Sequence, residues 1–312
     1  MFLPLFLLIG FVLLTICSGF YVFWVGCVRR KEFPWLEDAI EKTPYGKYRD
    51  AIRSSDRFLK QEQAEDIWID SHDGLKLHAH WIPAKDPVGT VILAHGYRST
   101  KLVDFSVVYR MYHDWGLNLL VPDQRAHGQS QGRFITFGVN ESKDMKGWIG
   151  WHNQQNQNQP IMLSGLSMGA STMLFLADQP LAPNVKGIIA DCGFSSPWDI
   201  VSAVFRKVTH LPPYPSVWVA NLFAKALAGF DLRARDTMSI LPHSCVPVLL
   251  VHGTEDDFVP CSMTKEAYKV CNEPKKLLLV EGAGHGVSFL VEPERYMETV
   301  KEFFFICMGV RL

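Results

Sequence analysis

The chain has 312 residues, and its 31 lysines and arginines are balanced by 32 aspartates and glutamates, which gives a formal net charge of −1. This balance offers no electrostatic reason to bind a polyanion, so it argues against a nucleic-acid-binding protein. Once the uncharged N-terminal stretch is set aside, the remaining length suits one large domain with a sizeable core.

The first segment, residues 1–28, predicts a transmembrane anchor. No charged side chain occurs from Phe2 to Val28, and the run is long enough to cross a hydrocarbon layer of ~30 Å as a helix. A cleaved secretory signal would need a basic start, which this sequence lacks. Three bases, Arg29 to Lys31, follow the run, so the positive-inside tendency predicts a single-pass protein whose body faces the cytoplasm. The odd number of cysteines in the body, without a close-set framework, favours the same compartment.

Residues 29–63 predict a juxtamembrane connector, because the composition turns charged there. A stripe of apolar residues at helical spacing indicates an amphipathic helix within it: Tyr45, Tyr48, Ile52 and Leu59.

Residues 64–312 predict one α/β domain. A leading antiparallel hairpin is followed by apolar runs that alternate with helical stretches, as in a mostly parallel sheet covered by helices on both faces. Residues 194–241 break the alternation and are aromatic and proline-rich, which predicts a helical cap over the strand ends. The strand candidates are Ile67–Ile69, Leu75–Ile82, Thr90–Ala94, Leu117–Val121, Ile161–Leu163, Val185–Ala190, Val246–Val251 and Leu277–Val280.

The turn after Ile161–Leu163 carries the clearest chemical signal. Ser167 lies between Gly165 and Gly169, just before a helix-forming run. A sharp strand-to-helix turn that exposes a serine hydroxyl needs small neighbours, because a side chain at either glycine would collide with the folded backbone. The sequence therefore predicts Ser167 as a nucleophile, with the backbone N–H of Met168 available to stabilise an oxyanion.

A serine nucleophile needs a histidine base and a carboxylate that holds the base in one tautomer. His285 lies in a glycine-rich loop after the last apolar run, and an acidic turn after the preceding strand offers Glu255, Asp256 and Asp257. The order serine, acid, histidine is the one found in α/β-hydrolases.

These motifs cover nearly the whole body from about Asp66 onward, and they resemble the α/β-hydrolase superfamily. The chain is most similar to bacterial membrane-anchored hydrolases of the BEM46-like and serine-aminopeptidase-like kinds. The resemblance implies that Asp256 is the third member of the triad, with Glu255 and Asp257 as alternatives. It rests on His95–Ser99, Asp123–Gly132, the GLSMG turn, His252–Pro260 and the GAGHG loop.

The same resemblance implies that the backbone N–H of Tyr97 is the second oxyanion donor. It also implies structural roles for His95, Asp123 and His127. A single glycine follows His95 where many lipases have three, which points away from esters of bulky tertiary alcohols.

The predicted function is that of a serine hydrolase cleaving carboxylic esters of a small-molecule acyl substrate, without a cofactor or metal. Thioesters and small peptides or amides are the alternative substrates, and a non-catalytic ligand-binding protein is the alternative of another class. His78 and His80 share one face of a predicted strand, but no third ligand at suitable spacing accompanies them, so no metal site is expected. The oligomeric state is not predicted.

Overall fold

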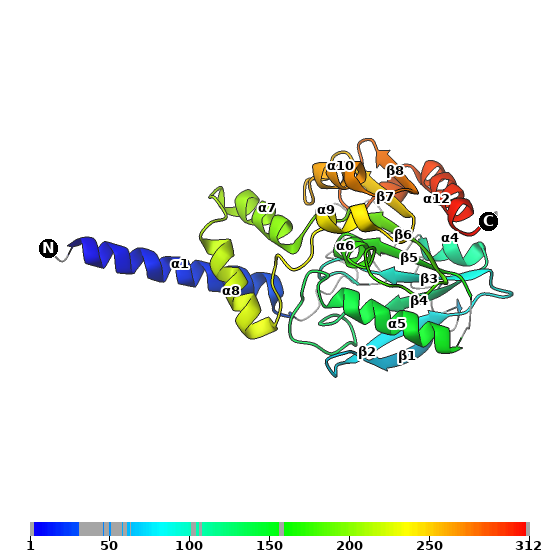
Figure 1. Ribbon diagram of the computed structural model, residues 1–312, viewed down its shortest axis with the longest axis horizontal. Helices are drawn as coiled ribbons and strands as arrows, with labels where there is room; N and C mark the ends of the chain where they lie inside the picture. The colour runs from blue at the N-terminus through cyan, green and yellow to red at the C-terminus, as the bar shows by residue number, and fades with distance from the viewer. Residues whose placement is uncertain are drawn as a thin grey trace.

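The computed structural model describes residues 3–30, 46, 50, 58, 61–62, 64–100, 104–105, 108–155 and 159–309, so most of the predicted connector lies outside the described residues. Figure 1 shows a layered α/β body with one long helix, α1, projecting from it at the N-terminal end. The strands are β1 (Glu65–Asp70), β2 (Lys76–Ile82), β3 (Gly89–Ala94), β4 (Leu117–Pro122), β5 (Ile161–Leu166), β6 (Val185–Asp191), β7 (Val248–Gly253) and β8 (Lys275–Val280). The helices are α1 (Leu3–Cys27), α4 (Val108–Asp114), α5 (Glu141–Gln155), α6 (Met168–Leu174), α7 (Pro197–Thr209), α8 (Ser216–Ala228), α9 (Thr237–Ile240), α10 (Cys261–Val270), α11 (Ser288–Val291) and α12 (Pro293–Met308).

Eight strands form one sheet in the order β1-β2-β4-β3-β5-β6-β7-β8. β2 pairs antiparallel with β1 and β4, and the strands from β4 to β8 run parallel. Every one of the eight predicted strands is present, within two or three residues of its expected bounds. β3, β4 and β7 are buried along their whole length, which is why their sequences are apolar on both faces.

Two hydrophobic clusters cover the two faces of the sheet. One contains side chains of α5, α6 and α10, and the other contains side chains of α4 and α12. Because the strands from β4 to β8 are parallel, the loops at their carboxyl ends meet at one edge, where α/β proteins hold their sites.

The insertion between β6 and β7 forms α7, α8 and α9, and α8 crosses α1 while the C-terminal end of α1 reaches the body (Figure 1). The sequence predicts an apolar segment that is separate from the globular body, but in the structure the C-terminal end of this segment packs into the body. Phe23 and Cys27 are buried there. α1 packs along α8, where a Cβ added at Gly19 would lie 2.4 Å from a methyl carbon of Val219.

Candidate active site

Ser167 lies at the turn between β5 and α6 with φ 54° and ψ −117°, a backbone conformation that costs energy for any residue other than glycine. The two flanking glycines make this turn possible. A Cβ at Gly169 would lie 1.8 Å from the carbonyl oxygen of Ala94, and a Cβ at Gly165 would lie 2.3 Å from the carbonyl carbon of Gly169. The expectation that both positions must be glycine is therefore confirmed.

Three side chains from three strand-end loops meet beside this turn. The Ser167 hydroxyl donates to Nε2 of His285 at 2.9 Å, and Nδ1–H of His285 donates to Oδ2 of Asp256 at 2.7 Å. His285 follows β8 and Asp256 follows β7, so the parallel sheet brings them to Ser167 at the end of β5. This geometry allows proton transfer from the hydroxyl to an imidazole held in one tautomer.

The Asp256 carboxylate is fully buried and accepts several hydrogen bonds. Oδ1 accepts from the backbone N–H groups of Phe258 (2.9 Å) and Val259 (2.8 Å), and Oδ2 also lies 3.1 Å from Nε2 of His252. Burial alone would raise the pKa of Asp256, but the hydrogen bonds from His252 and His285 outweigh it and hold that pKa well below its usual range. The group is therefore an anion at neutral pH.

The two alternative acids are placed differently. The side chain of Asp257 is 86% exposed and pairs with Lys207 at 3.0 Å, and Glu255 is exposed at the surface. Of the three carboxylates in this turn, only Asp256 contacts the imidazole of His285.

The loop after β3 lies against Ser167. A Cβ added at Gly96 would lie 3.3 Å from Cβ of Ser167, and the N–H of Gly96 donates to Asp104 at 2.5 Å. Within the described part of the chain, the N–H of Tyr97 donates to no other group, and the N–H of Met168 is in the first turn of α6, where no intrahelical acceptor exists. The loop and the helix thus leave two backbone donors beside the serine.

A buried histidine holds the Tyr97 loop in place. Nδ1–H of His127 donates to the carbonyl of Arg125 at 2.9 Å, and Nε2 accepts from the N–H of Arg98 at 3.0 Å. Burial and the neighbouring His95 together lower the pKa of His127 to about 3, although its bond to Arg125 opposes them, so it is neutral near pH 7.

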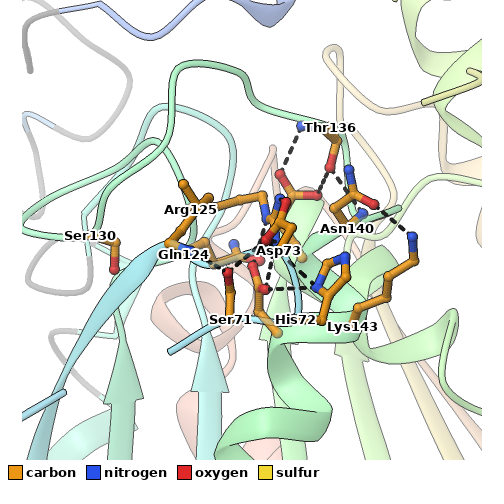
Figure 2. A network of polar contacts seen from close by, with 12 residues as sticks. Ser71, His72, Asp73, Gln124, Arg125, Ser130, Thr136, Asn140 and Lys143 are labelled. Atoms are coloured by element: carbon orange, nitrogen blue, oxygen red, sulfur yellow. Dashed lines mark hydrogen bonds and ion pairs between the residues drawn. The ribbon is translucent and has the colours of Figure 1, made fainter. Parts of the chain in front are cut away.

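The backbone around His127 is in turn fixed by the Arg125 guanidinium. Figure 2 shows Arg125 reaching toward Asp73 within a dense polar network. The guanidinium binds Asp144 through two hydrogen bonds of 2.6 and 2.7 Å and Asp73 through two of 2.8 and 3.0 Å. Bidentate pairs of this kind fix geometry as well as contribute energy, so the network positions the loop that carries His127.

The sequence motifs did not single out Asp191, the last residue of β6. Its backbone carbonyl accepts from the N–H of Ser167 at 2.8 Å, and its buried carboxylate accepts from the Ser288 hydroxyl at 3.2 Å. Burial raises its pKa to about 6, opposed by the nearby His252. The signal was an acid at the end of an apolar run, the same pattern that identified the turn of Asp256.

The His78 and His80 pair has an acidic neighbour that the sequence did not reveal. Asp66 lies 2.8 Å from Nε2 of His78 and 3.2 Å from Nε2 of His80, because antiparallel pairing sets Asp66 opposite His80. The expectation that no third ligand accompanies this pair is therefore wrong, and the three side chains could hold a metal ion. Asp123 binds the other ring nitrogen of His78 at 2.7 Å.

Comparison with known proteins identifies the family. Residues 142–288 match a family model described as serine hydrolase (FSH1), and residues 73–204 match one described as X-Pro dipeptidyl-peptidase (S15 family). The Pyrococcus furiosus esterase Pf2001 has a similar structure, with a TM-score of 0.66 and 25% identity, over 80% of this chain and 94% of that one. The chain belongs to the α/β-hydrolase superfamily.

Relatives of this α/β-hydrolase occur in bacteria and animals. The Bacillus subtilis protein YqkD is 29% identical over 82% of this chain and 84% of its own length. The lysophosphatidylserine lipase ABHD12 of Danio rerio is 26% identical over 64% of this chain and 50% of its own. The matches to serine hydrolases and esterases make this α/β-hydrolase a serine hydrolase.

Among the described helices of this hydrolase, α1 alone is long and apolar enough to cross a membrane, as a membrane span or a signal sequence would be.

Proposed function

We propose that this serine hydrolase cleaves carboxylic esters through an acyl-Ser167 intermediate. The observation that carries the proposal is the continuous hydrogen-bonded line from the Ser167 hydroxyl through His285 to the buried anion of Asp256. In this mechanism Ser167 attacks the ester carbonyl while Nε2 of His285 takes its proton. The proton then passes to the departing alcohol, and water activated by His285 releases the acid.

The oxyanion of each tetrahedral intermediate lies between the N–H groups of Met168 and Tyr97 in this proposal. Donors of this kind are aimed at the charge that develops in the transition state, and losing one costs about 10²–10³ in kcat. His127 and Arg125 act only by holding the Tyr97 loop in position.

Thioesters and small amides remain alternative substrates, and the match to a dipeptidyl-peptidase family model favours an amide substrate. The cavity next to Ser167 favours the ester. None of the described residues that line it is an aspartate or glutamate, whereas recognition of a peptide amino terminus calls for an acidic partner. The esterase Pf2001 among the similar structures supports the same choice.

We further propose that α1 anchors the protein in a membrane with the body on the cytoplasmic side. The uncharged helix followed by Arg29, Arg30 and Lys31 supports this orientation. Protease added to intact cells should leave the body undigested, and digestion without membrane rupture would refute the orientation. Detection of a shortened form without α1 would refute the anchor.

The test of catalysis is the full-length Ser167→Ala variant in detergent. We expect loss of fluorophosphonate labelling and of p-nitrophenyl acetate hydrolysis, with an unchanged melting temperature. If the protein were a receptor with an unactivated serine, the wild-type protein itself would not react with the fluorophosphonate. If Ser167→Ala hydrolysed the ester at nearly the wild-type rate, the nucleophile would be another residue.

A further inference from the structure

A cavity of about 430 Å³ lies next to Ser167, a size typical of small-molecule sites. α1 supplies one wall and α7 supplies another, so part of the binding pocket comes from the helix predicted to be only an anchor. The wall residues from α1 are Ser18, Tyr21, Val22, Val25 and Gly26, and those from α7 are Ile200, Val201, Val204, Phe205, Val208 and Thr209.

The wall formed by α1 is fixed to the body by direct contacts. The Arg98 guanidinium donates to the carbonyls of Val25 (2.5 Å) and Val28 (3.0 Å), and the Tyr97 hydroxyl donates to the carbonyl of Gly26 at 2.9 Å. These donors belong to the same loop that carries the proposed oxyanion N–H. The position of α1 is therefore coupled to the catalytic loop itself.

A second set of contacts fixes α1 to the cap. The Ser18 hydroxyl donates to Ser216 at 2.9 Å, and the ring of Phe223 in α8 packs on Phe20 and Phe23 with centroids 5.2 and 6.2 Å apart. Small residues at a close helix crossing, here Ser18 and Gly19, are typical of helices that pack against each other within a bilayer.

The far end of the cavity opens on an apolar surface. Three of its lining residues are strongly exposed: Tyr21 is 67% exposed, Val208 is 72% and Leu211 is 59%. The outer face of α1 continues this surface, with Leu14 69% exposed, and so does α8, with Trp218 42% exposed. An exposed apolar surface of this extent marks contact with a membrane or a partner, and the length and composition of α1 favour a membrane.

The depth of the opening follows from the helix rise. Eighteen residues separate Leu3 from Tyr21, which corresponds to ~27 Å along a helix and nearly spans a hydrocarbon layer of ~30 Å. Tyr21 and Trp24 on α1 and Trp218 on α8 are exposed aromatic residues of the kind that collects at the boundary between hydrocarbon and headgroups. The opening thus lies where the ester bond of a bilayer lipid resides.

We propose that the substrate is a bilayer-resident ester with a long acyl chain, which reaches Ser167 sideways from the membrane between α1 and α7. The alkyl chain occupies the cavity while the carbonyl meets Ser167. The bond from Oγ of Ser167 to the acyl carbon forms as the ester C–O bond breaks, and the hydroxyl proton leaves with the alcohol through His285. Water then releases the fatty acid and restores the serine. This inference rests on the proposed esterase function.

The test uses full-length protein reconstituted into phosphatidylcholine vesicles with two p-nitrophenyl esters, the water-soluble acetate and the membrane-dissolved palmitate. The leaving group is the same, so the ratio of palmitate to acetate hydrolysis reports only on the acyl chain. Val22→Trp narrows the cavity from α1 and Val204→Trp narrows it from α7. Displacing two methylene groups from the cavity should lower this ratio about 15-fold, since each buried methylene contributes about fourfold.

Leu13→Trp is the matched control, because Leu13 is on α1, is 57% exposed and does not line the cavity. Both of its rates should equal those of wild type. If Val22→Trp and Val204→Trp both leave the ratio unchanged, the chain does not occupy this cavity. If Val22→Trp fails to fold, Val204→Trp decides the outcome alone.

A second arm distinguishes a chain that arrives from the bilayer from one that arrives through water. Palmitate ester dissolved in the enzyme's own vesicles should be hydrolysed much faster than the same ester held in separate, protein-free vesicles. Equal rates would overturn lateral access. Loss of acetate hydrolysis in Ser167→Ala is measured in the same vesicles, so failure of the esterase mechanism is recognised separately from failure of this inference.

Discussion

Asp256→Asn is the substitution whose outcome the structure constrains most closely. Oδ1 of Asp256 accepts from two backbone N–H groups, those of Phe258 and Val259. An asparagine there would keep its amide oxygen at that position, which directs its NH₂ group toward Nδ1 of His285. An NH₂ donor stabilises the tautomer in which Nδ1 is an acceptor and Nε2 carries the hydrogen. That tautomer cannot take a proton from Ser167.

We therefore expect Asp256→Asn to lower kcat/KM for p-nitrophenyl acetate by about 10⁴, the loss seen in serine proteases when the same change traps the wrong tautomer. This corresponds to about 5.4 kcal/mol of transition-state stabilisation at 1.36 kcal/mol per tenfold. The full-length protein in detergent is assayed at neutral pH, with thermal melting as a check on folding.

Asp257→Asn is the matched control, since that side chain is 86% exposed and forms a surface ion pair with Lys207. It should change kcat/KM by less than about twofold, because exposed ion pairs contribute little. A loss in Asp257→Asn larger than that in Asp256→Asn would show that the catalytic carboxylate is misassigned. An Asp256→Asn protein that is folded and retains a tenth of the activity would refute the tautomer argument.

Two further predictions concern the turn and the loop brace. Gly169→Ala should lower the free energy of unfolding in urea by more than about 4 kcal/mol, because the added Cβ would collide with the Ala94 carbonyl. The control Gly150→Ala, in open space on α5, should raise it by up to about 1 kcal/mol. Similar values for the two variants would contradict the close approach at Gly169. His127 has a folded-state pKa of about 3, below its usual 6.5, so between these values the unfolded chain binds the proton first and stability falls as the pH is lowered. His127→Phe should remove that part of the pH dependence of stability, and it should lower kcat about tenfold because the bond to the Arg98 N–H is lost. If the free energy of unfolding of the variant keeps the same dependence on pH as wild type, His127 is not buried in its neutral form.

The strands and the proposed catalytic residues could be predicted because their signals are local. Buried parallel strands such as β7 are apolar on both faces, and Ser167 and His285 occur in small-residue loops directly after such runs. Asp191 had a local signal, its place at the end of an apolar run, but its partners and those of Asp66 are set by the order and register of the strands, which no single segment encodes.

The role of α1 could not be derived from its composition, since a run of apolar residues looks the same whether it faces lipid or protein. Ser18 and Gly19, small residues in the half of the helix nearest the body, were the signal of close helix packing. Their significance depends on α8, which lies far along the chain.

The contact between α1 and α8 also joins an early part of the chain to a part that is synthesised much later. During synthesis α1 emerges long before the cap, while the residues of α8 are still untranslated. The wall beside Val22 is completed only when the later cap folds back onto a helix already in place. If α1 is the anchor proposed above, a copy outside the membrane would leave the apolar faces of α1 and the cap in water, where they favour aggregation.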